Sequence, residues 1–187
     1  MLTLSTLLSL LIQTYTMVLL LRIWMQWARC DFHNPFSQFI FKITQPIVAP
    51  LRRIVPSMGP IDSASFLIVL VLSAVKVFLN PYVTMDGVFI VLAAVLIILK
   101  TVGSLIFWVL LAMAIMSWVS QGRMPVEYVL IQLTEPLLRP IRRLLPSMGG
   151  IDFSPMILVL LMYVINMGVM EFLSNNIVPL AYIWSWA

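Results

Sequence analysis

Two stretches of this chain bring arginine, proline and aspartate together in the same order. Residues 44–62 read TQPIVAPLRRIVPSMGPID, and residues 134–152 read TEPLLRPIRRLLPSMGGID. Guanidinium groups bind phosphates and carboxylates through charge-assisted hydrogen bonds, and basic residues beside a bilayer attract anionic headgroups. We therefore expect a docking surface for anionic lipid or a membrane-protein partner, formed by Arg52, Arg53, Asp62, Arg142, Arg143 and Asp152.

The same motif also has a purely structural interpretation, as a duplicated surface elbow that fixes the topology of the chain. Asp62 and Asp152 come just before an apolar segment, where a carboxylate suits the positive end of a helix. Ser154-Pro155 is typical of an N-cap followed by the first helical residue. The residues alone leave the docking and structural interpretations both open.

A second set of candidates lies within apolar surroundings, where polar side chains are the first suspects for function. It consists of Lys76, Lys100, Asn166 and Glu171. The two lysines and the glutamate should lie at similar depth, so a lysine–glutamate ion pair is geometrically possible. The structural interpretation is that these side chains snorkel to the outer interface and form such a pair, and the functional alternative is a cation or proton path. Asn166 is better explained as an interhelical hydrogen bond than as a ligand.

The two stretches are copies of one unit. At a constant offset of 90, eleven of the nineteen positions are identical, whereas average residue usage predicts roughly one chance match. The correspondence extends outward, pairing Pro35 with Pro125 and Lys76 with Asn166. We therefore predict two tandem repeats, over residues 1–84 and 85–187.

Composition indicates what these repeats must be built from. Hydrophobic residues make up 62% of the 187 residues and charged residues 10%, against about 45–50% and 25% in soluble domains. We predict an all-α membrane protein with four transmembrane helices, at roughly 3–27, 63–80, 100–118 and 155–173, each near the roughly 20 residues that a bilayer requires. Residues 88–99 are left as a helix extension, a re-entrant arm or part of a fifth span.

The distribution of charge favours four spans over five. Loop 28–62 and loop 119–154 together hold eight of the eleven basic residues. Four spans place both loops on one side, which the positive-inside rule makes cytoplasmic, with both termini periplasmic. The two-span repeats would then be parallel. Within each loop, apolar spacing predicts an amphipathic helix in the headgroup layer, which the proline pairs Pro46/Pro50 and Pro136/Pro140 should break into short pieces.

Several classes of function find little support in the residues. We see no catalytic triad, glycine-rich phosphate loop or paired carboxylate motif, so we do not expect an enzyme. Cys30, Asp31 and His33 fall short of a zinc set, and we expect no metal and no cofactor. The net charge of +4 comes from residues that flank membrane spans, so direct nucleic-acid binding is not expected. Tyr182, Trp184 and Trp186 are interpreted as an anchor at the outer interface.

The sequences PLRRIVPSMGPID and PLLRPIRRLLPSMGGIDFSP resemble the signature of the YggT family of bacterial membrane proteins, and the Arg22 to Trp27 end of the first span is similar too. Two departures are Met113 at the position of Arg22, and Ala64-Ser65 in place of Ser154-Pro155. The resemblance implies a non-enzymatic scaffold or assembly factor of the bacterial inner membrane. The alternative is a small transporter or channel component in osmotic stress or cation homeostasis. A homo-oligomer is a further expectation.

Overall fold

The computed structural model describes residues 4–55, 62–79, 87–119, 124–144 and 152–187 of the chain. All regular secondary structure in these residues is helical. The helices are α1 (Leu4–Trp27), α2 (Pro35–Arg52), α3 (Ser63–Phe78), α4 (Gly87–Val119), α5 (Pro125–Leu144), α6 (Ser154–Asn176) and α7 (Val178–Trp186). The prediction of an all-α fold is therefore confirmed for the described part of the chain.

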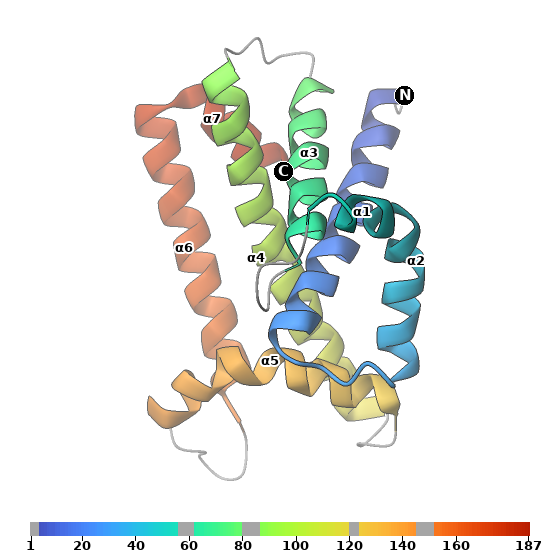
Figure 1. The fold of residues 1–187 in the computed structure, drawn as a ribbon. Helices are drawn as coiled ribbons and strands as arrows, with labels where there is room; N and C mark the ends of the chain where they lie inside the picture. Colours follow the sequence, from blue (N-terminus) through green and yellow to red (C-terminus); the bar gives the residue numbers. More distant parts are fainter. Residues whose placement is uncertain (1–3, 56–61, 80–86, 120–123, 145–151) are drawn as a thin grey trace.

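Three helices, α1, α4 and α6, are long and apolar enough to cross a membrane. The predicted second span corresponds to α3, which is equally apolar but has only 16 residues. At 1.5 Å per residue α3 measures about 24 Å, less than the roughly 30 Å of a hydrocarbon core. Figure 1 shows α3 beginning part of the way up the bundle, after α2 has risen beside α1.

The helices are packed unevenly. Helices α1, α3 and α4 contact one another and bury a core that includes Leu19, Val69 and Leu105. Helix α6 contacts α7 and α5 but barely touches α4, and only Ser154 and Leu173 of its residues are buried. Figure 1 shows α6 standing at one edge of the bundle, with α7 near its upper end and α5 near its lower end.

The segment 88–99 is part of one unbroken helix. Helix α4 runs from Gly87 to Val119, so the third apolar segment begins 13 residues before Lys100, and the alternative of a re-entrant arm is wrong. Nothing in this segment interrupts a helix, because it contains neither proline nor internal glycine. Its buried residues Ala93 and Ile97 belong to a second core cluster with Leu180 and Trp184 of α7.

The proline pairs do not break the two amphipathic helices. Helix α2 continues through Pro46 and Pro50, and α5 continues through Pro136 and Pro140. All four prolines lie on exposed faces, so the hydrogen bonds that they remove are lost away from the core. Figure 1 shows both helices bending instead of ending. The prediction that each loop falls into separate helical pieces was therefore wrong.

The two amphipathic helices lie differently in the structure. In Figure 1, α5 lies across the lower end of the bundle, where it contacts α4, α2 and α6. The first part of α2 instead stands beside α1, and only its C-terminal part turns across the bundle. The exposed face of α2 is correspondingly apolar, with Phe39, Ile43 and Ile47 at helical spacing.

The ends of the helices show how the motif aspartates act locally. Asp62 caps α3, since its side chain accepts the backbone N–H of Ser65. Asp152 accepts the N–H of Ser154. Ser154 is the first residue of α6 and makes no side-chain cap, so the prediction of Ser154 as the N-cap was wrong by one residue. The proline-to-glycine parts of the motif, 56–59 and 146–149, lie outside the described residues.

Candidate functional site

The first elbow encloses a buried ion cluster. The guanidinium of Arg22 on α1 and the carboxylate of Asp62 are both fully buried, with Arg22 Nε 3.3 Å from Asp62 Oδ2. Arg22 Nε is not aligned for a hydrogen bond there, so this contact is an ion pair only. Arg52 at the end of α2 also pairs with Asp62 Oδ2. Helices α1 and α2 and the start of α3 are thereby joined at one carboxylate.

Arg22 and Asp62 have further polar and aromatic partners in this cluster. Arg22 Nη1 donates to Thr44 Oγ1 at 2.7 Å and Nη2 donates to Gln45 Oε1 at 3.1 Å, both on α2. The guanidinium carbon of Arg22 lies 4.5 Å from the centre of the Phe41 ring, a cation–π distance. The Ser65 hydroxyl donates to Asp62 Oδ2 at 2.8 Å. A buried charge is tolerable only when it is paired and hydrogen-bonded in this way.

The charge state of Asp62 follows from these contacts. Burial by itself raises the pKa of the Asp62 carboxyl. Hydrogen bonds from Ser65 and Arg52, together with the positive charge of Arg52, outweigh burial and hold the pKa below its ordinary value. Asp62 is therefore ionised at neutral pH, and two arginines surround one carboxylate.

The second elbow uses the same motif residues at the surface. Arg142 Nε donates to Asp152 Oδ2 at 2.8 Å, and Arg142 also pairs with Glu135. Arg139 lies 3.6 Å from the same glutamate. The side chain of Asp152 is 41% exposed, in contrast to the fully buried Asp62. Burial raises the pKa of Asp152, but hydrogen bonds from Ser154 and Arg142, together with the positive charge of Arg142, hold it below the ordinary value.

The residue opposite the motif explains this difference. Thr134 Oγ1 donates to the sulfur of Met113 at 3.1 Å, whereas its counterpart Thr44 accepts from Arg22. Met113 thus occupies in the second unit the place that Arg22 takes in the first. Because the second unit has no buried cation at this position, Asp152 has no buried partner and can remain at the surface.

The structure separates the predicted docking residues into two kinds. Arg52 and Arg142 are paired with the motif carboxylates, Arg52 with the buried Asp62 and Arg142 with the partly exposed Asp152. Arg53 and Arg143, the second arginine of each pair, are exposed and make no ion pair with another described residue. Of the four arginines, these two have no described carboxylate beside them to neutralise their charge.

The predicted intramembrane residues, Lys76, Lys100, Asn166 and Glu171, also lie in different places in the structure. Lys76 is buried between α1, α3 and α4 and donates to Gln13 Oε1 at 2.6 Å. Gln13 in turn donates to Thr101 Oγ1 at 3.2 Å. Lys100, one residue away in the chain from Thr101, faces a different part of the molecule. The two lysines therefore do not share one site.

Lys100 faces α6 and α7. Its ammonium donates to Asn166 Oδ1 at 2.7 Å and lies 4.9 Å from the centre of the Trp184 ring. Trp184 Nε1 donates to the same oxygen at 3.2 Å. The predicted pairing of a lysine with Glu171 is not seen among the described residues, where Glu171 is exposed. Trp184 is buried, so of the predicted outer anchor residues this one serves packing instead.

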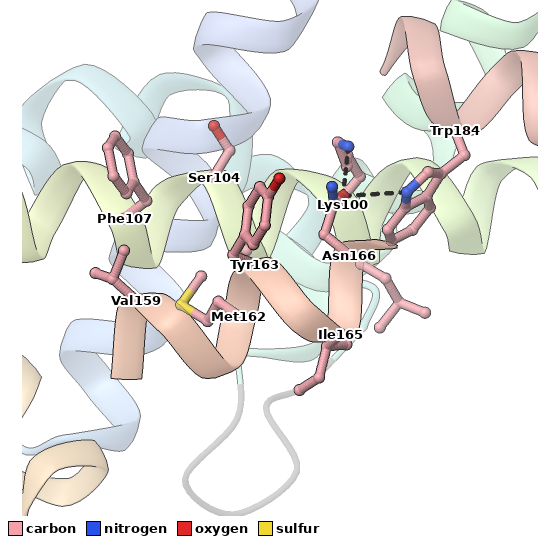
Figure 2. A pocket seen from close by; sticks show the side chains of 11 residues that line it. Lys100, Ser104, Phe107, Val159, Met162, Tyr163, Ile165, Asn166 and Trp184 are labelled. Carbon is pink, nitrogen blue, oxygen red and sulfur yellow. Dashed lines mark hydrogen bonds between the residues drawn. The ribbon is translucent and has the colours of Figure 1, made fainter. Parts of the chain in front are cut away.

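A cavity of about 420 Å³ opens beside Lys100, between α4 and α6. Figure 2 shows that its walls come from two helices, with Lys100, Ser104 and Phe107 on one and Val159, Met162, Tyr163 and Asn166 on the other. Trp184 closes one end, and both dashed hydrogen bonds in the figure converge on Asn166. The walls are mostly apolar, and Lys100 is the one charged residue among those that line the cavity.

Cys30, Asp31 and His33 do not form a common site. Asp31 Oδ1 lies 3.2 Å from His33 Nδ1, and both side chains are largely exposed. Cys30 is buried away from solvent, and burial raises the pKa of its thiol to about 11. In the described ranges, no three ligand-type side chains gather closely enough to hold a metal ion.

Sequence reasoning missed several partners within these clusters. Arg22 carries a signal, because it is the first charged residue of the chain and lies within an apolar helix. Gln13 carries a weaker one, as an amide in the middle of an apolar segment. Trp184 carries none, since an aromatic residue near a predicted interface is indistinguishable from an anchor until α7 is seen to fold back on α4.

Comparisons with known proteins agree with the repeat. The sequence profile described as CCB3/YggT matches residues 1–83 and again residues 92–173. The chain is 70% identical over 180 residues to "Uncharacterized protein YggT" of Escherichia coli K12, covering 95% of this chain and 96% of that one.

More distant relatives also match over most of their length. A Vibrio alginolyticus protein is 52% identical over 82% of this chain and 86% of its own length. An uncharacterized Haemophilus influenzae protein is 39% identical over 88% and 90%, respectively. No solved structure matches the chain.

Proposed function

Because this chain belongs to the CCB3/YggT family, we propose that it is a non-enzymatic scaffold or assembly factor of the bacterial inner membrane. Its apolar helices are compatible with a multi-pass membrane protein. The proposal assigns the two elbows to docking, through Arg53 and Arg143, on anionic lipid or a membrane partner. Four crossings, by α1, α3, α4 and α6, complete the proposed arrangement, with both elbows on the cytoplasmic side.

One observation carries this proposal: in each motif the first arginine pairs with the aspartate of the same motif, and the second arginine is exposed. In both copies the first arginine of the pair binds the aspartate ten residues further on. That contact ties the amphipathic helix to the start of the next apolar helix. The adjacent arginine then faces outward from a rigid support, which is what a docking surface requires.

The docking role is tested by separating the two kinds of arginine. In Arg53→Gln/Arg143→Gln, two exposed charges worth about 1 kcal/mol each near an anionic surface are removed without touching an internal ion pair. We expect normal insertion and thermal stability, a reduced preference for phosphatidylglycerol over phosphatidylcholine in brominated-lipid quenching of tryptophan, and failure to complement a deletion strain. Lys42→Gln removes an exposed charge outside the motif and is the matched control. Unchanged lipid preference together with full complementation would leave the elbows a structural role only.

The orientation has its own test. In a background without Cys30, cysteines placed at Ser57 and Ser147 should both resist an impermeant thiol reagent in intact cells, whereas a cysteine at Ser185 should react. Reaction at Ser147 but not at Ser57 would place the two elbows on opposite faces and contradict four crossings.

A second candidate function, cation handling, is supported by the polar column between α1 and α3. Below the Lys76–Gln13 bond, the buried hydroxyls of Thr16 and Ser73 have no hydrogen-bond partner among the described residues. They lie one helical turn along α1 and α3 from that bond. Fully buried Leu19 and Val69 interrupt the column lower down. Purified protein in liposomes should then produce a cation flux that Lys76→Met changes, and no flux from folded protein would remove this candidate.

A further inference from the structure

The cavity between α4 and α6 is rich in hydrogen-bond donors and poor in acceptors. Lys100 Nζ and Trp184 Nε1 both donate to the same atom, Asn166 Oδ1. An ammonium group carries three N–H donors, and the Asn166 amide adds two more on Nδ2. The hydroxyls of Ser104 and Tyr163 are the other polar groups lining the space. Even with these hydroxyls counted as acceptors too, the side-chain donors outnumber the side-chain acceptors, and none of the lining residues supplies a negative charge.

The depth of this cluster restricts what can supply the missing acceptor. Asn166 is the thirteenth of the 23 residues of α6. It therefore lies about 18 Å from one end of the helix and 15 Å from the other. A phospholipid phosphate stays at the bilayer surface, far from this level. A side chain on a transmembrane helix can be placed at any depth.

The surroundings of the cavity are those of an unfilled helix interface. Helix α6 barely touches α4, and its apolar side chains Leu160, Val164 and Met167 are exposed. On α4, the small residues Gly103 and Ser104 line the cavity beside Lys100 and leave room there. A Cβ on Gly103 would meet only the Met162 methyl, at 3.9 Å. Side chains of another helix can thus enter the space without displacing the backbone.

We propose that this cavity docks a transmembrane helix of a partner protein that carries a carboxylate, Asp or Glu, near the middle of its span. The carboxylate would bind Lys100, Trp184 and the Asn166 amide, while apolar side chains beside it fill the walls lined by Phe107, Val159 and Met162. A desolvated cation and a desolvated carboxylate stabilise each other where no water competes. The inference rests on the scaffold function proposed above and specifies the class of partner.

The test uses full-length protein in phosphatidylcholine liposomes with labelled single-span leucine–alanine peptides. One peptide has a central glutamate, a second has glutamine there, and a third has the glutamate two turns nearer one end. Energy transfer between protein and peptide reports association. We expect the central-glutamate peptide to associate about tenfold more tightly than the other two.

Variants of Lys100 show whether the carboxylate meets this side chain. Lys100→Met should abolish the advantage of the glutamate peptide, Lys100→Arg should keep most of it, and Lys100→Glu should transfer the preference to a central-lysine peptide. Glu171→Gln changes an exposed charge on α6 away from the cavity, and should leave association unchanged. The gain of lysine-peptide binding cannot come from misfolding, and melting temperatures are measured for each variant.

Equal association of the glutamate and glutamine peptides, or an undiminished preference in Lys100→Met, would overturn the proposal. So would anionic lipid that is retained in native mass spectra and lost in Lys100→Met when no peptide is discriminated, because the cavity would then be a lipid site. Failure here is distinct from failure of the elbows, since Arg53 and Arg143 are intact in every variant. Loss of elbow function with normal peptide discrimination would conversely leave this site standing.

Discussion

The two elbows have the same motif but differ in where they hold their charge. In the first, Asp62 is fully buried against Arg22 and Arg52; in the second, Asp152 is 41% exposed and Arg142 is shared with Glu135. Two positions outside the identical residues account for this difference. Met113 replaces Arg22, and Glu135 replaces Gln45. The comparison teaches that a duplicated motif takes its electrostatic environment from the neighbouring helix.

Substitution of the two motif aspartates should give the largest difference in stability between the two elbows. Asp62→Asn leaves Arg22 buried with no carboxylate, and removing one partner of a buried ion pair costs about 3–5 kcal/mol. Asp152→Asn removes a partly exposed ion pair, which is worth about 1 kcal/mol or less. The free energies of unfolding in mixed detergent micelles measure both. Equal losses would contradict the buried and exposed assignments.

Substitutions that give the first elbow the residues of the second test whether these positions cause the difference between the two elbows. Arg22→Met should destabilise the protein by about 2–4 kcal/mol, less than the Asp62 substitution because Arg52 and Ser65 still bind the carboxylate. Adding Gln45→Glu should recover part of the loss by giving Arg52 the partner that Glu135 gives Arg142. Met113→Leu is the matched control on α4. No recovery in the double variant would mean that these two positions do not act together.

Much of the architecture could be predicted from residue pattern, because the pattern records local preferences. Apolar runs indicate the long helices, and the spacing of apolar residues indicates amphipathic α2 and α5. The buried contact of Arg22 with Asp62 could not be predicted, since it joins residues 40 apart through packing of α1 on α3. The proline pairs were misread because proline ends a helix only where its lost hydrogen bond cannot be replaced, and these prolines are exposed.

A smaller difference is expected at the two threonines. Thr44→Val removes the acceptor for a buried guanidinium, which should cost about 1.5–3 kcal/mol. Thr134→Val loses a hydroxyl that faces the weak acceptor sulfur of Met113 and should cost under about 1 kcal/mol. The same unfolding titration measures both. A larger loss at Thr134 would reverse the assignment of the charged centre to the first elbow.

The smallest effect is expected from acidification. Both aspartates have a folded-state pKa below the ordinary 3.8, so their stabilising contribution is present above that pH and is lost as pH falls through the folded pKa. Unfolding measured between pH 7 and pH 3 should therefore show stability falling only below about pH 4. The fall should be shallower in Asp62→Asn and in Asp152→Asn than in the unaltered protein. A profile that neither substitution changes would mean that these carboxylates do not set the acid response.

The unbroken helix α4 connects the upper and lower parts of the bundle. Its 33 residues measure about 50 Å, roughly 20 Å more than a hydrocarbon core. Its upper part packs on α3 and α7, and its lower part contacts α5. A rod of this length accommodates a thinner or thicker bilayer by tilting, and α5 must then move with its lower end. Depth-dependent quenching of a probe on α5, compared between lipids of short and long acyl chains, would detect that movement. We therefore expect the position of the second elbow to depend on bilayer thickness.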